Sequence, residues 1–202
     1  MYELIAAEPY VLMARGSRFL AQLHPATDGE TAKRVVSSVR QSHPDATHVV
    51  HALVVGAAGG ILGCSDDGEP AGTAGRPALE VLRGSRITNV VLTITRWFGG
   101  IKLGTGGLVH AYSESARGAV DAAEIREIIP MREFAFTVPF AILEGAKRLF
   151  AECGFVVASG DFGADGYAVS GRIAQENAGD FARRIGDLSR GRIKLAETPE
   201  RG

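Results

Sequence analysis

Apolar residues follow two different periods in the first two-thirds of the chain. After the Thr27-to-Glu30 segment, which has the Thr-x-x-Glu pattern of a capping box, they recur at helical spacing until His43-Pro44. Short β-branched runs typical of strands follow, and the glycine-rich residues 56–60 between the first two runs predict a hairpin. The further elements expected here are strands at residues 49–55, 61–64 and 87–97 and helices at 77–82 and 108–120.

One of these strands differs from the others in its pattern. Residues 90–94 read Val-Val-Leu-Thr-Ile, which is too continuously apolar for a strand with one face in water. A strand buried on both faces is therefore expected. Since the next helix begins after residues 98–107, the predicted order is strand, glycine-rich loop and helix.

After Pro130 the pattern starts again with a different order of elements. Extended and helical segments alternate as βαββαβ, which is the order of a ferredoxin-like sandwich. The strands are expected at residues 134–140, 155–162, 167–173 and 193–196, with helices after the first and the third strand. The sequence thus predicts a mixed α+β chain of two domains, residues 1–130 and 131–202.

Composition narrows the class of protein. The 202 residues are 46% hydrophobic and 22% charged, without an apolar run long enough to span a membrane. The two cysteines, Cys64 and Cys153, form no metal-binding or disulfide pattern, and the first residues lack a secretory signal. The expectation is a cytoplasmic protein with reduced thiols.

Charge argues against one kind of partner. Residues 1–130 carry 12 Lys or Arg against 13 Asp or Glu, and residues 131–202 carry 10 of each. Strong sequence-independent binding to DNA draws its affinity from many phosphate contacts, so neither half fits it. A local basic stripe is compatible with this balance.

Half of the glycines, 13 of 26, lie between Gly56 and Gly107, and this region holds two unusual segments. The first, residues 64–75, places Asp66, Asp67 and Glu69 within four positions and follows them with small residues. Such crowded carboxylates need a compensating partner: Mg²⁺, a basic protein segment or the chain's own Arg and Lys. The alternative is an Asx-type turn that caps the next helix.

The second segment, residues 96–107, combines Arg96 and Lys102 with five glycines. A glycine-rich loop before a helix presents free N–H groups that bind a phosphate or carboxylate. The spacing matches neither a P-loop nor a dinucleotide motif. One alternative is an internal brace in which these amides receive the acidic carboxylates. Another is a purely structural pairing of Asp66 and Asp67 with Arg96 and Lys102.

The histidines, cysteines and aromatic residues indicate neither a metal site nor a cofactor site. His48 and His51 are three apart on a predicted strand, so they face opposite ways and do not form a chelating pair. The carboxylates near Cys64 make it a poor nucleophile. Trp97 and Phe98 are expected to fill the core rather than to stack on a base.

Three stretches together resemble the signature of the YigZ/IMPACT family: Ser17-Arg18-Phe19, residues 65–75 and residues 95–109. The resemblance covers about residues 15–122, and the βαββαβ tail is similar to the second domain of bacterial members. It implies a first domain of the ribosomal-protein-S-five domain 2 type, with a left-handed βαβ unit, and a tail like the last domain of elongation factor G. His110 stands where relatives usually have arginine, which removes a fixed cation at neutral pH.

The resemblance also implies a function in translation, because eukaryotic members bind the activator of a translation-regulating kinase. The leading hypothesis is a non-enzymatic module that binds RNA, the ribosome or a translation-related protein. The rival is an enzyme for a phosphorylated or carboxylated small molecule, in which Lys102 holds the anion and an acidic residue is the base or metal ligand. The candidate binding residues are Ser65, Asp66, Asp67, Glu69, Thr73, Arg96, Gly99, Gly100, Lys102, Gly104, Gly106 and Gly107.

Overall fold

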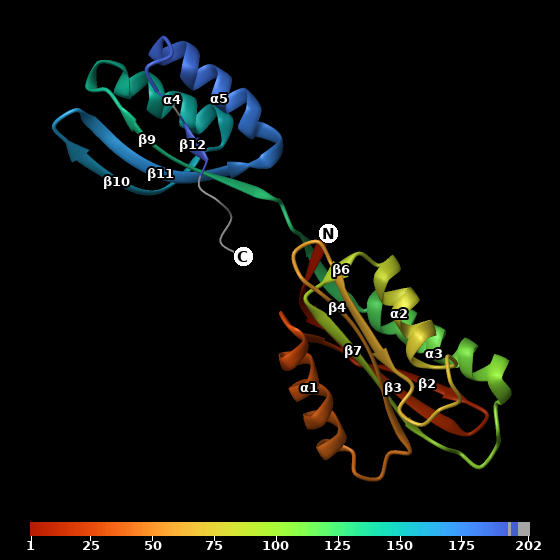
Figure 1. Ribbon diagram of the computed structural model, residues 1–202. Coiled ribbons are helices and arrows are strands. Elements are labelled where there is room, and N and C mark those ends of the chain that lie inside the picture. The colour runs from red at the N-terminus through yellow and green to blue at the C-terminus, as the bar shows by residue number, and fades with distance from the viewer. Residues whose placement is uncertain (194, 198–202) are drawn as a thin grey trace. The chain divides into compact units, whose positions relative to one another are not determined.

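The computed structural model describes residues 1–193 and 195–197 and contains two compact units (Figure 1). The first unit is Met1–Ile128, and the second begins at Ile129. The sequence pattern placed this division at residue 130. The mixed α+β class with two units is confirmed, and each unit is described by itself below.

A five-stranded sheet with the order β2-β3-β7-β4-β5 forms the centre of the first unit, and each pair of neighbours is antiparallel. The central strand is buried from Val90 to Arg96, which confirms the expected burial on both faces. The strands are β2 (Tyr10–Ala14), β3 (Ser17–Pro25), β4 (His48–Val55), β5 (Ile61–Ser65) and β7 (Val90–Trp97).

The strand expected over residues 87–97 is interrupted. Asn89 has a φ of 54°, a left-handed conformation that separates β6 (Ile87–Thr88) from β7. The Asn89 side-chain oxygen accepts a hydrogen bond from the N–H of Gly56 at 3.0 Å. Asparagine tolerates this backbone conformation better than most residues, so the break depends on a tertiary contact as well as on residue type.

A second, three-stranded sheet has the order β6-β1-β8. Strand β1 (Tyr2–Ala7) pairs in parallel with β6 and antiparallel with β8 (Ala123–Glu127). The sequence pattern predicted neither β1 nor β8, nor the hairpin of β2 and β3. The pairing of β1 with β8 brings the two ends of the first unit's chain together.

Three helices cover the five-stranded sheet from its two faces (Figure 1). Helix α1 (Gly29–Ser42) packs on one face through Ala32, with Val35 and Val36 beside it. Helices α2 (Gly75–Gly84) and α3 (Gly104–Asp121) pack on the other face, where the larger hydrophobic core lies. The two helices therefore meet on the side of the sheet opposite α1.

The residue that caps α1 differs from the expected one. Asp28, not Thr27, is the N-cap, and its carboxylate accepts a hydrogen bond from the N–H of Thr31 at 2.7 Å. Thr27 lies outside the helix and donates its hydroxyl to Asp28 at 3.3 Å. The capping-box prediction was therefore wrong by one position, because the carboxylate rather than the hydroxyl reaches the first turn.

The second unit has the strand order β10-β11-β9-β12 with antiparallel neighbours, which is the ferredoxin-like arrangement. The last strand was expected at residues 193–196, of which residue 194 lies outside the described residues. The elements are β9 (Met131–Val138), a 3₁₀ turn (Phe140–Ile142), α4 (Leu143–Cys153), β10 (Val156–Gly163), β11 (Gly166–Ala174), α5 (Gln175–Ser189) and β12 (Ala196–Glu197).

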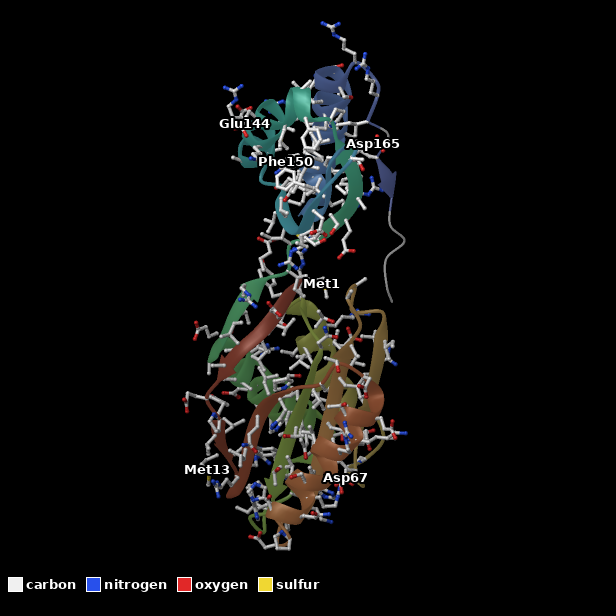
Figure 2. All side chains as sticks on the ribbon, turned by 90° about the vertical axis from the view of Figure 1, so that its left-hand side faces the viewer. Met1, Met13, Asp67, Glu144, Phe150 and Asp165 are labelled. Carbon is white, nitrogen blue, oxygen red and sulfur yellow. The ribbon has the colours of Figure 1, made fainter. Side chains whose placement is uncertain are left out.

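Phenylalanine rings form the core of the second unit. The ring of Phe181, which is fully buried, contacts four others, those of Phe134, Phe136, Phe150 and Phe155. Figure 2 shows Phe150 inside this cluster. Among the described helices of both units, none combines the length and the mean hydropathy that spanning a lipid bilayer requires.

This core provides a direct test of the second unit. We expect Phe181→Ala to lower the free energy of unfolding by about 3–5 kcal/mol, because it removes a buried ring that several others contact. Phe162→Ala is the control, since Phe162 is 69% exposed and should cost less than about 1 kcal/mol. Chemical denaturation followed by circular dichroism measures both. Equal losses would contradict the assignment of the core.

Candidate functional site

The carboxylate of Asp66 turns back onto its own loop. It accepts hydrogen bonds from the N–H groups of Gly72 at 2.8 Å, Ala74 at 3.0 Å and Gly75 at 2.8 Å. The latter two are the amides at which α2 begins, and the N-cap residue Ala74 offers no side-chain cap of its own. Burial alone would raise the pKa of Asp66, but these three bonds outweigh it and lower the pKa. Asp66 is therefore the cap of α2.

Two further candidates of this segment also bond within it. Ser65 accepts a hydrogen bond at its hydroxyl from the N–H of Asp67 at 3.2 Å. Thr73 donates its hydroxyl to the carbonyl of Pro70 at 2.6 Å. The side chains of both residues thus hold the loop in shape.

Asp67 links the acidic loop to α1 and β4. Its carboxylate pairs with Arg40 and accepts a hydrogen bond from the N–H of Val49 at 2.6 Å. Burial by itself raises the pKa of Asp67. The hydrogen bonds from Arg40 and from the Val49 amide together lower it by more, so the net shift of the pKa is downward. The alternative in which Asp66 and Asp67 pair with Arg96 and Lys102 is contradicted, because closer donors satisfy both carboxylates. Figure 2 shows Asp67 and Met1 at opposite ends of the first unit.

Glu69 is the carboxylate that joins the two segments. It is only 8% exposed and lies 2.5 Å from Arg96 Nη1, and Arg96 is 5% exposed. The hydroxyl of Tyr112 on α3 donates to the same Glu69 oxygen at 2.7 Å. Burial raises the pKa of Tyr112 and the bond to Glu69 raises it further, so the hydroxyl keeps its proton and remains a donor.

Arg96 extends this network to β3. Its Nη2 donates to the hydroxyl of Ser17 at 3.2 Å, and the same hydroxyl accepts the N–H of Gly99 at 3.3 Å. A Cβ built on Gly99 would overlap the backbone carbonyl of Gly16, so the β2–β3 turn and residues 98–100 require glycine at both positions. The buried pair therefore holds four segments together: β3, the acidic loop, β7 and α3.

The structure contradicts one alternative for the glycine-rich loop, the internal brace in which its amides receive the acidic carboxylates. The amides of Phe98 and Gly99 bond to the hydroxyls of Thr47 and Ser17, not to the acidic carboxylates. The loop is also shorter than predicted, because α3 begins at Gly104 and takes Gly106 and Gly107 into its first turn. No side chain caps this helix, and its first turn holds no acidic residue.

The aromatic residues of this loop are not in the core, contrary to expectation. Phe98 is 46% exposed and Trp97 is half-buried. The indole N–H of Trp97 donates to Asp45 at 2.9 Å, and the Arg18 guanidinium lies 4.8 Å from the Trp97 ring centre. Ile101, three residues after Phe98, is 57% exposed.

Exposed cations lie beside these apolar side chains. Arg15, Arg18 and Lys102 are exposed, and none of them forms an ion pair within residues 1–193 and 195–197. Arg15 precedes Gly16, which packs against Gly99, and Arg18 lies beside Trp97. We call Arg15, Arg18, Phe98, Ile101 and Lys102 the glycine-loop surface.

Of the candidate binding residues predicted from the sequence, only Lys102 belongs to this surface. The strand pattern of Ser17-Arg18-Phe19 carried a signal for Arg18, because the buried Ser17 and Phe19 leave Arg18 on the opposite face. His110 stands at the position where relatives usually have arginine. It lies exposed on α3, with its Nε2 3.3 Å from Glu114. In the part of the chain that the structure describes, no three His, Cys, Asp or Glu side chains converge as a metal-binding group.

The fold defines a two-domain α+β protein whose first domain carries loops tied by a buried ion pair. Residues 15–120 match the Impact N-terminal domain. The chain is 37% identical over 203 residues to the IMPACT family member YigZ of Escherichia coli (strain K12), with 98% of each chain covered. The chain belongs to the IMPACT family, and the resemblance in its motifs is confirmed.

Other relatives extend the comparison. The IMPACT family member YvyE of Bacillus subtilis (strain 168) is 28% identical over 191 residues, which cover 95% of this chain and 88% of that one. A crystal structure described as that of a hypothetical protein is 34% identical, with a TM-score of 0.65. It covers 98% of this chain and 97% of that chain, so both units have a counterpart there.

The buried pair predicts a large effect of a small change. Glu69→Gln should lower the free energy of unfolding by about 3–5 kcal/mol, because it leaves the charge of Arg96 buried and unpaired. Glu80→Gln makes the same change in an exposed pair with Arg83 and should cost about 0–1 kcal/mol. Urea denaturation followed by Trp97 fluorescence measures both. A cost for Glu69→Gln as small as that of the control would contradict the structural role.

Asp66 predicts a pH dependence. Its pKa in the folded chain lies below the ordinary value of 3.8, so its ionised form stabilises the fold above pH 3.8. This stabilisation is lost as the pH falls below 3.8 through the lower folded pKa. Asp66→Asn should therefore reduce stability at pH 6 and flatten its decline as the pH falls below 3.8. Urea denaturation across this range tests it, and parallel curves for the two proteins would refute it.

Proposed function

We propose that this chain is a non-enzymatic binding protein of translation or its regulation, and that the glycine-loop surface contacts RNA. The observation that carries this proposal is the set of unpaired cations, Arg15, Arg18 and Lys102, beside the exposed Phe98 and Ile101. Proteins that bind single-stranded RNA combine cations that follow the backbone with aromatic side chains that stack on bases.

The roles of the individual residues follow from their chemistry. Phe98 offers an exposed ring to a base, while Lys102 and Arg18 neutralise phosphates on either side of it. The uncapped first turn of α3 lies directly after Lys102, and its free N–H groups favour an anion. The glycines of this region have no side chains, so a ligand can approach the backbone closely. They are Gly99, Gly100, Gly104, Gly106 and Gly107.

The acidic loop supports this surface without being part of it. Asp66, Asp67 and Glu69 accept hydrogen bonds from the chain's own donors, and Glu69 holds Arg96 beneath the loop. A carboxylate in use as a cap or an ion-pair partner is a poor base, so the binding function is preferred to the small-molecule enzyme. A local cationic surface on a nearly neutral chain favours a defined RNA element over DNA in general.

The link to translation draws its support from the family. Membership of the IMPACT family fits a translation-related role, since the resemblance implies relatives that act on translational control. The ribosome is the RNA-containing particle on which such a role is most directly tested. We include a cytoplasmic location in the proposal because ribosomes are found there.

The proposal predicts a specific pattern of lost RNA binding. Phe98→Ala should weaken binding to single-stranded ribosomal RNA fragments roughly 5- to 100-fold, the usual effect of removing one base-stacking ring. Lys102→Gln should weaken it and reduce the slope of log affinity against log salt by about 0.7, the contribution of one phosphate contact. Filter binding at several salt concentrations measures both quantities.

The matched controls lie in the second unit. Phe162→Ala removes a ring that is more exposed than that of Phe98, and Arg148→Gln removes an exposed cation. Both should leave RNA affinity unchanged. If the wild-type protein binds neither ribosomes nor RNA at low salt, the proposal is wrong. If all four variants bind alike, RNA binding is not located at the glycine-loop surface.

A further inference from the structure

A groove between α2 and α3 is a second polar feature of the first unit. It has a volume of about 420 Å³. Arg76 of α2 and Arg117 of α3 line it together with the Ser113 hydroxyl, and Pro77, Val81 and Val109 form its apolar part. Neither the acidic loop's carboxylates nor the residues of the glycine-loop surface line this groove.

The charge of the groove is unbalanced. Arg76 and Arg117 are both exposed, and neither forms an ion pair with any described residue. The one carboxylate that lines the groove, Glu80, is bound by Arg83 at 2.8 Å. Two guanidinium groups at one groove repel each other, and an anion between them removes that repulsion.

The remaining lining specifies more than a bare anion. The Ser113 hydroxyl has no hydrogen-bond partner among residues 1–193 and 195–197, so it is available as a donor. Val109 is 39% exposed and, with Pro77 and Val81, forms an apolar wall beside the cations. Ligand sites commonly have this combination of a few convergent polar groups and an apolar wall, in volumes of about 300–1,000 Å³.

We propose that this groove binds a phosphate monoester attached to a nucleoside, either a free nucleoside monophosphate or the 5′-phosphorylated end of an RNA. The two guanidinium groups bind the phosphate oxygens through paired N–H bonds, a geometry that arginine forms better than lysine. Ser113 donates to a third oxygen. The nucleoside lies against Pro77, Val81 and Val109.

Isothermal titration calorimetry with adenosine 5′-monophosphate tests the groove on the full chain. We expect saturable binding to the wild type that weakens about tenfold or more in R76Q/R117Q, because each guanidinium makes charge-assisted hydrogen bonds. The single variants R76Q and R117Q should each give a smaller loss. R148Q, which removes an exposed arginine of the second unit, should bind as the wild type does.

Further ligands separate the parts of the proposal. Adenosine, without a phosphate, should not bind, and inorganic phosphate should bind more weakly than the nucleotide because it lacks the apolar contact. A short RNA that binds through the groove only when 5′-phosphorylated, and more tightly than the nucleotide, would identify an RNA end as the source. Tighter binding of the free nucleotide would identify a small molecule.

Two results would overturn the proposal: no saturable binding of the nucleotide or of 5′-phosphorylated RNA at millimolar concentration, or equal binding by the wild type and R76Q/R117Q. Thermal unfolding of each variant confirms that it is folded, and the single variants remain informative if the double variant is not. Because Phe98 and Lys102 lie outside the groove, F98A and K102Q separate this site from the glycine-loop surface.

Discussion

The ion pair of Glu69 with Arg96 is the contact on which the arrangement of the first unit's loops depends. Both side chains are almost fully buried, and removing two charges from water costs several kcal/mol unless hydrogen bonds replace the lost hydration. Tyr112 and Ser17 supply those bonds from α3 and β3. Such a pair adds little net stability compared with an apolar core, but it accepts one geometry only. It therefore fixes which parts of four segments meet.

The direction of the acidic side chains determines what the first unit presents to its surroundings. Asp66 caps α2, Asp67 pairs with Arg40 and Glu69 pairs with Arg96, so all three charges of this crowded loop are compensated within the chain. The glycine-rich loop has no such compensation, and its cations and aromatic ring remain exposed. A chain with a net charge of −1 thus has a local cationic surface. The groove between α2 and α3 follows the same principle, because its arginines have no acidic partner.

Local patterns were enough to predict most of the regular structure after residue 26. The continuous apolar run of β7 predicted its burial on both faces, and the repeated alternation after Pro130 predicted the order βαββαβ. Strands β1 and β8 were missed because their pairing is remote: they lie more than a hundred residues apart, so neither carries a hairpin signal. The β2–β3 hairpin was also missed, although its pairing is local. The capping-box pattern predicts Thr27 as the cap of α1, because such a pattern does not show which of two adjacent polar side chains reaches the helix.

The residue pattern alone shows that two segments, residues 64–75 and 96–107, carry the unusual chemistry, and their motifs resemble those of the family to which the chain belongs. It did not determine the partners of their charges. One alternative paired Asp66 and Asp67 with Arg96 and Lys102, yet in the folded chain Arg96 pairs with Glu69 and Asp67 pairs with Arg40. The tertiary structure decided this because charge compensation depends on distances of a few ångströms between residues far apart in the chain. The nearest donors to Asp66 and Asp67 are backbone amides and Arg40, whose positions only packing sets.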